Sequence, residues 1–421
     1  MRFDTILFDL DGTLTQSGEG IEKSVAHALR TLGYPVPPEE RLREFVGPPL
    51  YESLLKIARV REEDVSRAIE VFRERFREVG WRENRVYPGI PDLLSGIARS
   101  GGHSIIVTGK PEPLAQKVAR YFGLDRLLDG LVGTRYDERR SDKEHLIARA
   151  LEGRNPGRVA MVGDRRFDIE AARRRGFFTI GVTYGYGSRE ELEQAGADQI
   201  VETPQALREF LEVPLPRGRF LTFEGTDGSG KTTQLNRLRA RLEEMGYSLV
   251  FTREPGGCPI SERIRQVVLD IGSLGMSDEC EALLFAAARA EHVRSIILPA
   301  LAAGKIVLCD RFLDSSIAYQ AYGRELGEDL IRQINAPAVG RLKPDLTVLL
   351  LTDAATALGR QRAAHASDRM EVEKAQYFDR VLAGYRRLSE QEPDRFRVID
   401  AAGSIDTVYS AVEAAVLDFL H

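Results

Sequence analysis

The sixteen residues at 219–234, RFLTFEGTDGSGKTTQ, restrict the possible fold of this chain more than any other stretch. They begin with the alternating apolar residues of a strand and lead into an apolar face with helical spacing, formed by Leu235, Leu238, Leu242 and Met245. The glycines between these segments allow backbone N–H groups to surround phosphate oxygens, and the N-terminus of a helix favours anions. The pattern therefore predicts a strand, a phosphate-binding loop and a helix.

This loop predicts ATP and Mg²⁺ as cofactors. Lys231 would reach the β and γ phosphates, and the Thr232 hydroxyl would bind Mg²⁺. The expected nucleotide-binding residues are Gly225, Thr226, Asp227, Gly228, Ser229, Gly230, Lys231, Thr232 and Thr233.

The length of 421 residues predicts two domains. A net charge of -5 gives no indication of a nucleic-acid or membrane surface. Asp4 and Asp9 interrupt the only apolar segment near the N-terminus, so no signal peptide is predicted, and no run approaches the roughly 18 apolar residues of a membrane span. The three cysteines have no metal or redox spacing. We expect a cytoplasmic protein.

A short apolar strand at 5–8 ends in Asp9-Leu10-Asp11-Gly12. Alternate residues of an extended segment point the same way, so Asp9 and Asp11 can share a pocket. Two carboxylates this close repel each other unless a cation lies between them, and Mg²⁺ prefers oxygen ligands. The alternative is a simple Asp-Gly turn after the strand.

Three later segments extend this pattern. A strand at 105–107 ends in Thr108-Gly109-Lys110, Lys143 begins a helical stretch, and a strand at 159–162 ends in Gly163-Asp164, with Asp168 four residues on. In this order the segments resemble the four motifs of the haloacid dehalogenase superfamily of phosphohydrolases, over residues 1 to about 212.

That resemblance implies a role for each motif residue. Asp9 would be the nucleophile, Asp11 the general acid and base, and Thr108 and Lys143 would hold the transferring phosphoryl group. The Mg²⁺ site would consist of Asp9, Asp164 and the backbone at Asp11, supported by Asp168. An aspartate at position 11 favours phosphoryl chemistry over dehalogenation. A decayed, non-catalytic copy is the alternative.

Residues 16–86 show helical spacing without a strand, and the resemblance implies a helical cap that closes over the substrate. The segment FVGPPL at 45–50 is similar to the substrate-facing loop of relatives that act on phosphoglycolate or 5′-nucleotides. Gln16 and Gly109 stand where relatives more often carry Asp and Asn. The substrate therefore stays open among phosphoglycolate, a nucleoside monophosphate and a sugar phosphate.

The two prolines and the glycine of VPLPRG at 213–218 mark a boundary. We expect a phosphatase domain at 1–213, a linker at 214–218 and a second domain at 219–421. Strands and helices alternate in both halves. This predicts an α/β fold with two doubly wound parallel-sheet domains, one Rossmann-like and one a P-loop kinase domain.

The second half resembles the thymidylate kinase family. Its motifs occur in the family's order: the phosphate loop, TREPGG at 252–257, FAAAR at 285–289, DRF at 310–312, SSIAYQ at 315–320 and DRMEVE at 368–373. Guanidinium groups bind phosphate oxygens in pairs, so Arg253, Arg289 and Arg311 suit an acceptor monophosphate, while Phe285 can stack on a base.

The resemblance adds further roles in this half. Gln320 and Ser316 would read the thymine edge, and Tyr319 would crowd the ribose 2′ position. Asp227 would hold the 3′-hydroxyl side, while Asp310 and Thr232 would fix Mg²⁺. A lid is expected at about 360–370, where Arg360, Arg362 and Arg369 would steady the phosphoryl group because residues 226–229 contain no basic side chain. Alternatively, these arginines form a solvated helix face.

Together the resemblances predict a bifunctional enzyme that makes dTDP from dTMP and ATP and also hydrolyses a phosphomonoester. Its partners would be these small molecules, with a possible homodimer through the kinase domain. Two alternatives remain: an N-terminal half that only supports or regulates the kinase, and a C-terminal half that binds nucleotide without transfer. dUMP and UMP are further candidate acceptors.

Overall fold

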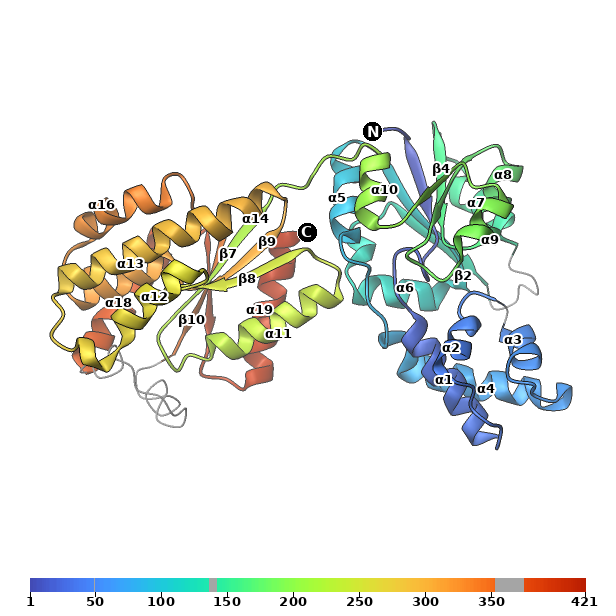
Figure 1. Ribbon diagram of the computed structural model, residues 1–421, viewed down its shortest axis with the longest axis horizontal. Helices are drawn as coiled ribbons and strands as arrows, with labels where there is room; N and C mark the ends of the chain where they lie inside the picture. Colours follow the sequence, from blue (N-terminus) through green and yellow to red (C-terminus); the bar gives the residue numbers. More distant parts are fainter. Residues whose placement is uncertain (49, 136–141, 353–374) are drawn as a thin grey trace. The chain divides into compact units, whose positions relative to one another are not determined.

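The computed structural model describes residues 1–48, 50–135, 142–352 and 375–421 (Figure 1). These residues form two compact units: the first comprises Met1–Pro216 and Glu244–Tyr247, and the second comprises Arg217–Glu243 and Ser248–His421. Each unit contains one parallel sheet, which confirms the predicted fold class. No helix in the described ranges combines the length and the apolar character needed to cross a membrane.

The N-terminal sheet has six parallel strands in the order β3-β2-β1-β4-β5-β6. The strands are β1 (Thr5–Phe8), β2 (His103–Pro111), β3 (Gly130–Thr134), β4 (Val159–Gly163), β5 (Phe178–Val182) and β6 (Gln199–Val201). The order reverses between β1 and β4, and open α/β sheets place their sites at the carboxyl ends of such strands.

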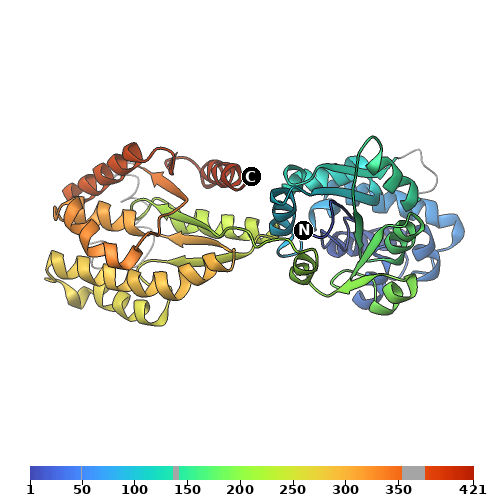
Figure 2. The same ribbon diagram turned by 90° about the horizontal axis from the view of Figure 1, so that it is seen from above.

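Helices cover both faces of this sheet (Figures 1 and 2). They are α5 (Ile90–Arg99), α6 (Glu112–Tyr121), α7 (Lys143–Leu151), α8 (Arg166–Arg174), α9 (Arg189–Ala195) and α10 (Pro204–Phe210), with a short 3₁₀ turn at Leu124–Arg126. Leu7, Val107 and Met161 of the sheet pack against Ile147 of α7 and Ala171 of α8. This buried layer fixes the strand ends that carry the motif residues.

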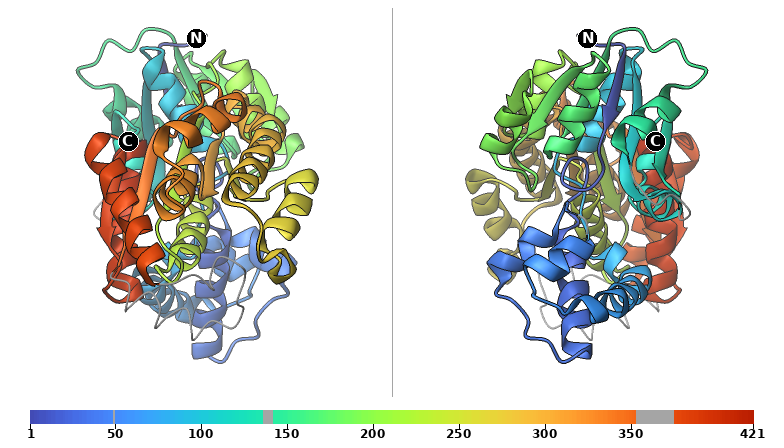
Figure 3. Two further views of the ribbon diagram at one scale, coloured as in Figure 1. Left: turned by 90° about the vertical axis from the view of Figure 1, so that its left-hand side faces the viewer. Right: turned by 90° about the vertical axis from the view of Figure 1, so that its right-hand side faces the viewer.

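The segment between β1 and α5 is helical and forms a separate group at one end of this unit (Figure 3, right panel). It comprises α1 (Gly18–Thr31), α2 (Glu39–Leu42), α3 (Leu50–Lys56) and α4 (Glu62–Glu78), with 3₁₀ turns at Arg43–Phe45 and Gly80–Arg82. Val25, Leu29, Leu54 and Val65 share its apolar core. This cap therefore has a core of its own.

The C-terminal sheet has five parallel strands in the order β11-β10-β7-β9-β8. They are β7 (Arg219–Glu224), β8 (Leu249–Arg253), β9 (Ile306–Asp310), β10 (Leu346–Leu351) and β11 (Phe396–Asp400). The central strand β7 is buried from Phe220 to Glu224. It leads directly into the phosphate loop.

In Figures 1 and 2, α12, α13 and α14 lie on one face of this sheet, and α11 and α19 lie on the other. The helices of this unit are α11 (Lys231–Glu244), α12 (Pro259–Leu269), α13 (Asp278–His292), α14 (Leu298–Ala302), α15 (Leu313–Ser316), α16 (Glu328–Val339), α18 (Ala375–Gln391) and α19 (Ile405–Leu420). A 3₁₀ turn spans Ile271–Ser273, and π-helical turns span Val293–Ile297 and Ile317–Gly323 (η6).

Candidate active sites

Three buried carboxylates meet at the carboxyl ends of β1 and β4. Asp9 follows β1, Asp164 follows β4, and Asp168 lies in the first turn of α8. Each contributes an oxygen atom, and these atoms all lie within 4.8 Å of one another. The strand order thus brings together residues that are more than 150 positions apart in the sequence.

This carboxylate cluster fits a divalent cation. Lys143 Nζ lies 2.5 Å from Asp9 Oδ1 and 2.6 Å from Asp168 Oδ1, so it pairs with two of the three carboxylates. Burial, together with the charges of Asp9 and Asp168, raises the pKa of Asp164 well above its ordinary value. Burial is also the main cause that raises the pKa of Asp9 to about 6. A hard cation with oxygen ligands, such as Mg²⁺, would relieve this repulsion.

Asp11 lies apart from the carboxylate cluster. Both of its carboxylate oxygens accept hydrogen bonds of 2.7 Å from Lys110 Nζ, so its side chain is paired with a lysine, while a metal contact through its backbone stays a prediction. The Lys110 backbone N–H donates to the Thr108 hydroxyl at 3.2 Å, and both residues are buried. Lys110 was missed as a site residue. Its spacing of two from Thr108 at a strand end is the signal that could have found it.

A loop after β5 connects Asp164 to the cap. The Tyr186 backbone N–H donates to Asp164 Oδ2 at 2.9 Å, and the Tyr186 hydroxyl accepts from the backbone N–H of Gly18 at 2.6 Å, where α1 begins. A Cβ atom on Gly185 would lie 2.4 Å from the Asp164 Cβ atom and 2.3 Å from the Gly12 carbonyl oxygen. No motif in the sequence predicts this loop as part of the site.

The FVGPPL segment of the cap is attached to the core by Arg165. Arg165 Nη1 donates to the Val46 carbonyl oxygen at 2.9 Å, and Arg165 Nε bonds Glu191 at 3.0 Å. Because Arg165 follows Asp164, the contact joins the cap segment to the carboxylate cluster. Gly109 faces open space, where an added Cβ would meet no atom within 4 Å, and Gln16 is exposed.

In the second unit, the phosphate loop turns through glycines with positive φ: 135° at Gly225, 77° at Gly228 and 86° at Gly230. A Cβ on Gly225 would lie 2.3 Å from the Leu350 carbonyl oxygen, so only glycine fits there. Lys231 Nζ donates to the carbonyl oxygens of Gly225 and Thr226 at 2.9 and 2.8 Å. Burial and the charge of Arg311 lower the pKa of Lys231 to about 8.

The loop also fits a magnesium–triphosphate group. Among the described residues, the hydroxyl oxygens of Thr226 and Ser229 and one carboxylate oxygen of Asp310 are buried without a hydrogen-bond partner. Such groups are costly to leave unpaired, and a phosphate–metal group would give them partners. The side chains of Thr232 and Thr233 are exposed at the start of α11.

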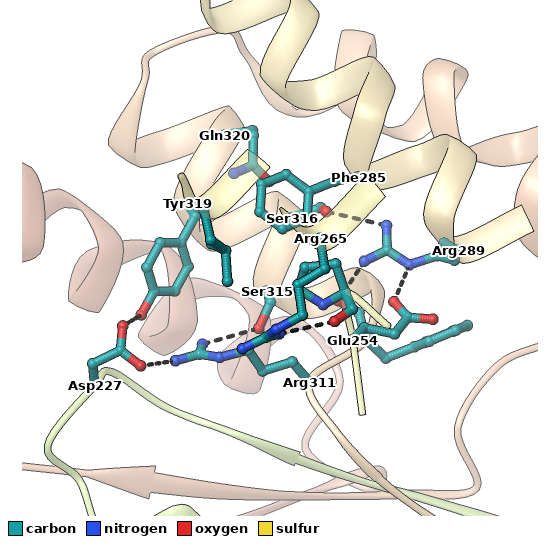
Figure 4. A pocket seen from close by; sticks show the side chains of 13 residues that line it. Asp227, Glu254, Arg265, Phe285, Arg289, Arg311, Ser315, Ser316, Tyr319 and Gln320 are labelled. Carbon is teal, nitrogen blue, oxygen red and sulfur yellow. Dashed lines mark hydrogen bonds and ion pairs between the residues drawn. The ribbon is translucent and has the colours of Figure 1, made fainter. Parts of the chain in front are cut away.

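A cleft of about 580 Å³, partly open to solvent, lies beside the loop (Figure 4). It is lined by seven predicted residues, namely Asp227, Phe285, Arg289, Arg311, Ser316, Tyr319 and Gln320. Arg265 also lines it and donates to the Pro255 carbonyl oxygen at 2.8 Å. No predicted motif includes Arg265, because α12 is identified only by its apolar face.

Arg311 joins the cleft to the phosphate loop. Its Nη2 forms an ion pair with Asp227 Oδ1, and its Nη1 donates to the Gly225 carbonyl oxygen at 3.1 Å. The Tyr319 hydroxyl donates to the other oxygen of Asp227 at 3.3 Å. Burial alone would raise the pKa of Asp227, but Arg311 and Lys231 lower it. Arg311 has a φ of 67°, which is uncommon for a residue other than glycine.

The other two predicted acceptor arginines differ in placement. Arg289 is buried, and Nε donates to Glu254 at 2.7 Å while Nη1 donates to Ser316 Oγ at 3.1 Å. Its remaining donors contact Asn335 and the Phe312 carbonyl oxygen. Arg253 is not among the lining residues of the cleft: its side chain is 47% exposed and pairs with Glu262 at 2.9 Å.

The expected lid lies outside the described residues. This applies to the whole range 360–370 and therefore to Arg360, Arg362 and Arg369.

Two family models match the chain, one in each half. The haloacid dehalogenase-like hydrolase model matches residues 6–182, and the thymidylate kinase model matches residues 223–412. The first match lies in the N-terminal unit, and the second match lies almost entirely in the C-terminal unit.

Curated relatives of the second half are named thymidylate kinase. One from Geobacter sulfurreducens is 46% identical over 209 residues, covering 48% of this chain and 97% of the relative. Another from Bifidobacterium longum is 48% identical over 202 residues, covering 47% of this chain and 97% of the relative. A solved structure of a predicted phosphatase from Clostridium acetobutylicum has 39% sequence identity and a TM-score of 0.47, covering 50% of this chain and 99% of that one.

Proposed function

Since this chain belongs to the thymidylate kinase family through its C-terminal half and carries a haloacid dehalogenase-like hydrolase domain in its N-terminal half, we propose that it is a bifunctional enzyme. The kinase domain, residues 219–421 with a lid at 360–370, converts dTMP and ATP to dTDP and ADP. The phosphatase domain, residues 1–213 with a cap at 16–86, hydrolyses a phosphomonoester. Residues 214–218 link them.

The observation that carries the kinase assignment is the cleft that opens beside the phosphate loop. Phe285 stacks on the base. Arg311, which follows β9, contacts the Gly225 carbonyl oxygen of the loop and also lines the cleft, where it can hold the acceptor phosphate. Lys231 moves from the loop carbonyl oxygens to the ATP phosphates. Mg²⁺ held near Thr232 and Asp310 would neutralise phosphate charge. Catalysis then consists of positioning and charge neutralisation.

The kinase assignment is tested on the full chain by measuring dTDP formation from ATP, dTMP and Mg²⁺. We expect turnover, and we expect Phe285→Ala to raise KM for dTMP more than it lowers kcat, since the ring contributes binding. ATP binding without any dTDP would instead support a nucleotide-binding protein without transfer. dUMP and UMP are tested as acceptors in the same assay.

In the phosphatase domain, a carboxylate oxygen of Asp9 attacks phosphorus, and the bond to the alcohol leaving group breaks. The leaving oxygen takes a proton from Asp11, and the phosphoryl group stays on Asp9 as an aspartyl-phosphate. Asp11 then takes a proton from water, which attacks phosphorus and restores the Asp9 carboxylate. Lys143 and Thr108 hold the phosphoryl oxygens. Mg²⁺ held by Asp9 and Asp164 would stabilise their negative charge, and Asp168 supports the site through Lys143.

A substrate panel with Mg²⁺ separates the candidate substrates of this domain. The panel contains phosphoglycolate, nucleoside monophosphates and sugar phosphates, with Asp9→Asn as the inactive control. Preference for a nucleoside monophosphate would place both reactions on related substrates. No hydrolysis of any compound above the Asp9→Asn background would favour the alternative that this domain supports or regulates the kinase.

The apolar surface of the kinase domain supports a homodimer. Four side chains on α12, α13 and α14 are about half exposed: Ile260 (53%), Val267 (50%), Leu283 (55%) and Leu298 (48%). Sedimentation of the full chain, compared with Leu283→Glu, tests the dimer. We also propose a cytoplasmic location, where ATP and dTMP are available and where the three free cysteines stay reduced.

A further inference from the structure

Behind the cleft lies a buried carboxylate that the proposed chemistry does not use. Glu281, in the first turn of α13, has no exposed surface. Its Oε1 accepts a hydrogen bond of 2.9 Å from Gln320 Nε2, and its Oε2 lies 3.0 Å from Arg324 Nη2. Gln320 belongs to the π-helical turn η6, and Arg324 follows this turn directly. Glu281 is therefore held in place by a cation while it contacts a residue that lines the cleft.

This contact determines which end of the Gln320 amide faces the cleft. A carboxylate has only acceptor atoms, whereas the amide has a donor end and an acceptor end. The NH₂ group must therefore face Glu281, because the opposite orientation would bring the amide oxygen against a buried negative charge. No hydrogen bond within the described ranges uses Gln320 Oε1. Figure 4 shows the amide beside the Phe285 ring, on the cleft side.

Ser316 supplies a complementary donor one helical turn before Gln320. Its Oγ accepts from Arg289 Nη1 at 3.1 Å, which leaves its hydroxyl hydrogen available to a ligand. The cleft thus offers an oriented acceptor and a donor close to the ring on which a base would stack. Thymine and uracil present a ring N–H next to a carbonyl oxygen, which matches this pair. Cytosine presents an unprotonated ring nitrogen at the N–H position, so two acceptors would face each other.

We propose that Glu281 is a positioning residue that fixes the Gln320 amide and thereby makes the acceptor site prefer a nucleobase with a ring N–H over one with an unprotonated ring nitrogen. The inference rests on the proposed kinase function and deepens it. Glu281 acts through Gln320 and does not touch the base. Turning the Gln320 amide around would offer cytosine a donor for its ring nitrogen. The buried charge of Glu281 makes that orientation unfavourable, because the amide oxygen would then face the carboxylate.

The test is the ratio of kcat/KM for dTMP to kcat/KM for dCMP, measured on the full chain. In Glu281→Gln, the new amide can either accept from Gln320 or donate to it, so both orientations of Gln320 become possible. We expect the ratio to fall about tenfold or more, mainly through a gain with dCMP, since sites built on hydrogen bonds discriminate strongly. The matched control is Asp278→Asn, because Asp278 also pairs with Arg324 at 3.3 Å, whereas within the described part of the chain the Gln320 amide donates to Glu281 and not to Asp278. Its ratio should stay that of the wild type.

A second comparison separates orientation from general stabilisation. In a Gln320→Met background, Glu281→Gln should leave the ratio unchanged, because the amide that it reorients is gone. If Glu281→Gln alone does not fold, Glu281→Gln with Arg324→Gln leaves no buried charge unpaired and is expected to show the same fall.

Two results would overturn the inference: an unchanged ratio in folded Glu281 variants, or an equal fall in Asp278→Asn. Absence of dTDP formation by the wild type would instead overturn the proposed function. In that case the relative affinities of the wild type and Glu281→Gln for dTMP and dCMP still test the positioning role, by calorimetry on the full chain.

Discussion

At the scale of single residues, largely buried lysines pair with the two aspartates that carry the proposed phosphatase chemistry: Lys143 with Asp9 and Lys110 with Asp11. In the phosphatase site Lys110 contacts both oxygens of Asp11 and lies over the Phe76 ring of the cap, 5.3 Å from its centre. Lys110→Met should lower phosphomonoester hydrolysis by about a hundredfold, because Asp11 loses the partner that orients it for proton transfer. Lys56→Met, at an exposed lysine of the cap, is the matched control. Equal activity of the two variants would contradict an orienting role for Lys110.

Glu224 gives a pH-dependent prediction for the kinase unit. It is buried at the end of β7 and accepts hydrogen bonds from the Phe312 N–H at 2.8 Å and the Tyr385 hydroxyl at 2.9 Å. Burial, and then the charge of Asp314, raises its pKa from 4.5 to about 7. Protonated Glu224 therefore contributes fully to the free energy of unfolding below pH 4.5. This contribution is lost as the pH rises to 7, because the buried carboxyl group then loses its proton.

The isosteric variant Glu224→Gln cannot lose that proton. Its free energy of unfolding should therefore rise relative to that of the wild type by up to about 3 kcal/mol between pH 4.5 and 7. Urea unfolding followed at several pH values measures the difference. A difference that does not change with pH would show that Glu224 titrates normally.

The residues of the two sites were predictable to different extents. Two residues of the phosphatase site, Asp9 and Asp164, directly follow strands, and Lys143 begins a helix. Their positions in the sequence therefore already place them at one edge of a sheet. Seven predicted residues line the kinase cleft because they belong to the motifs that resemble those of the thymidylate kinase family, and Phe285 and Arg289 among them lie within α13, away from any strand end. Arg265 on α12 and Glu281 on α13 lie outside every quoted motif, and apolar spacing along a helix does not predict which polar side chain lines a cleft or contacts its lining. Arg253 follows a strand in the expected way, yet its exposed side chain pairs with Glu262.

At the scale of helices and strands, long apolar segments were predictable and short or polar ones were not. The apolar pattern predicts β1, β2, β4 and β7 but not β3, β6 or β11. β3 contains two glycines, β6 has three residues, and in β11 the side chains of Arg397 and Val398 are exposed. These three strands lie at or next to the edges of their sheets, where one neighbouring strand and partial burial suffice.

The helix that carries Phe285, Arg289 and Glu281 gives a prediction at this scale. The Ser277 hydroxyl caps α13 by accepting from the Cys280 N–H at 3.3 Å. Ser277→Ala should destabilise the kinase unit by about 1 kcal/mol, which corresponds to a melting temperature lower by roughly 2–4 °C. The dTMP to dCMP ratio should not change. Ser295→Ala, at an exposed serine in the π-helical turn after α13, is the control for the loss of a hydroxyl.

At the scale of the whole molecule, each unit has its own sheet, its own core and its own site. Asp9→Asn should therefore abolish phosphomonoester hydrolysis while kcat and KM for dTMP stay within about twofold of the wild type, because the nucleophile serves one reaction only. Lys231→Met should do the reverse. Parallel assays of one preparation measure both. A change in dTDP formation by Asp9→Asn would reveal coupling between the two reactions.

Pro216 and Arg217 are consecutive residues of one polypeptide, so every ribosome that completes this chain makes the two units in equal number. Promoter strength and messenger lifetime then change the amounts of the two units together and leave the ratio between those amounts unchanged. A lineage that needs a different balance of phosphate transfer to phosphate removal has to alter side chains such as Lys110 or Gln320, since gene dosage gives it no independent control of either.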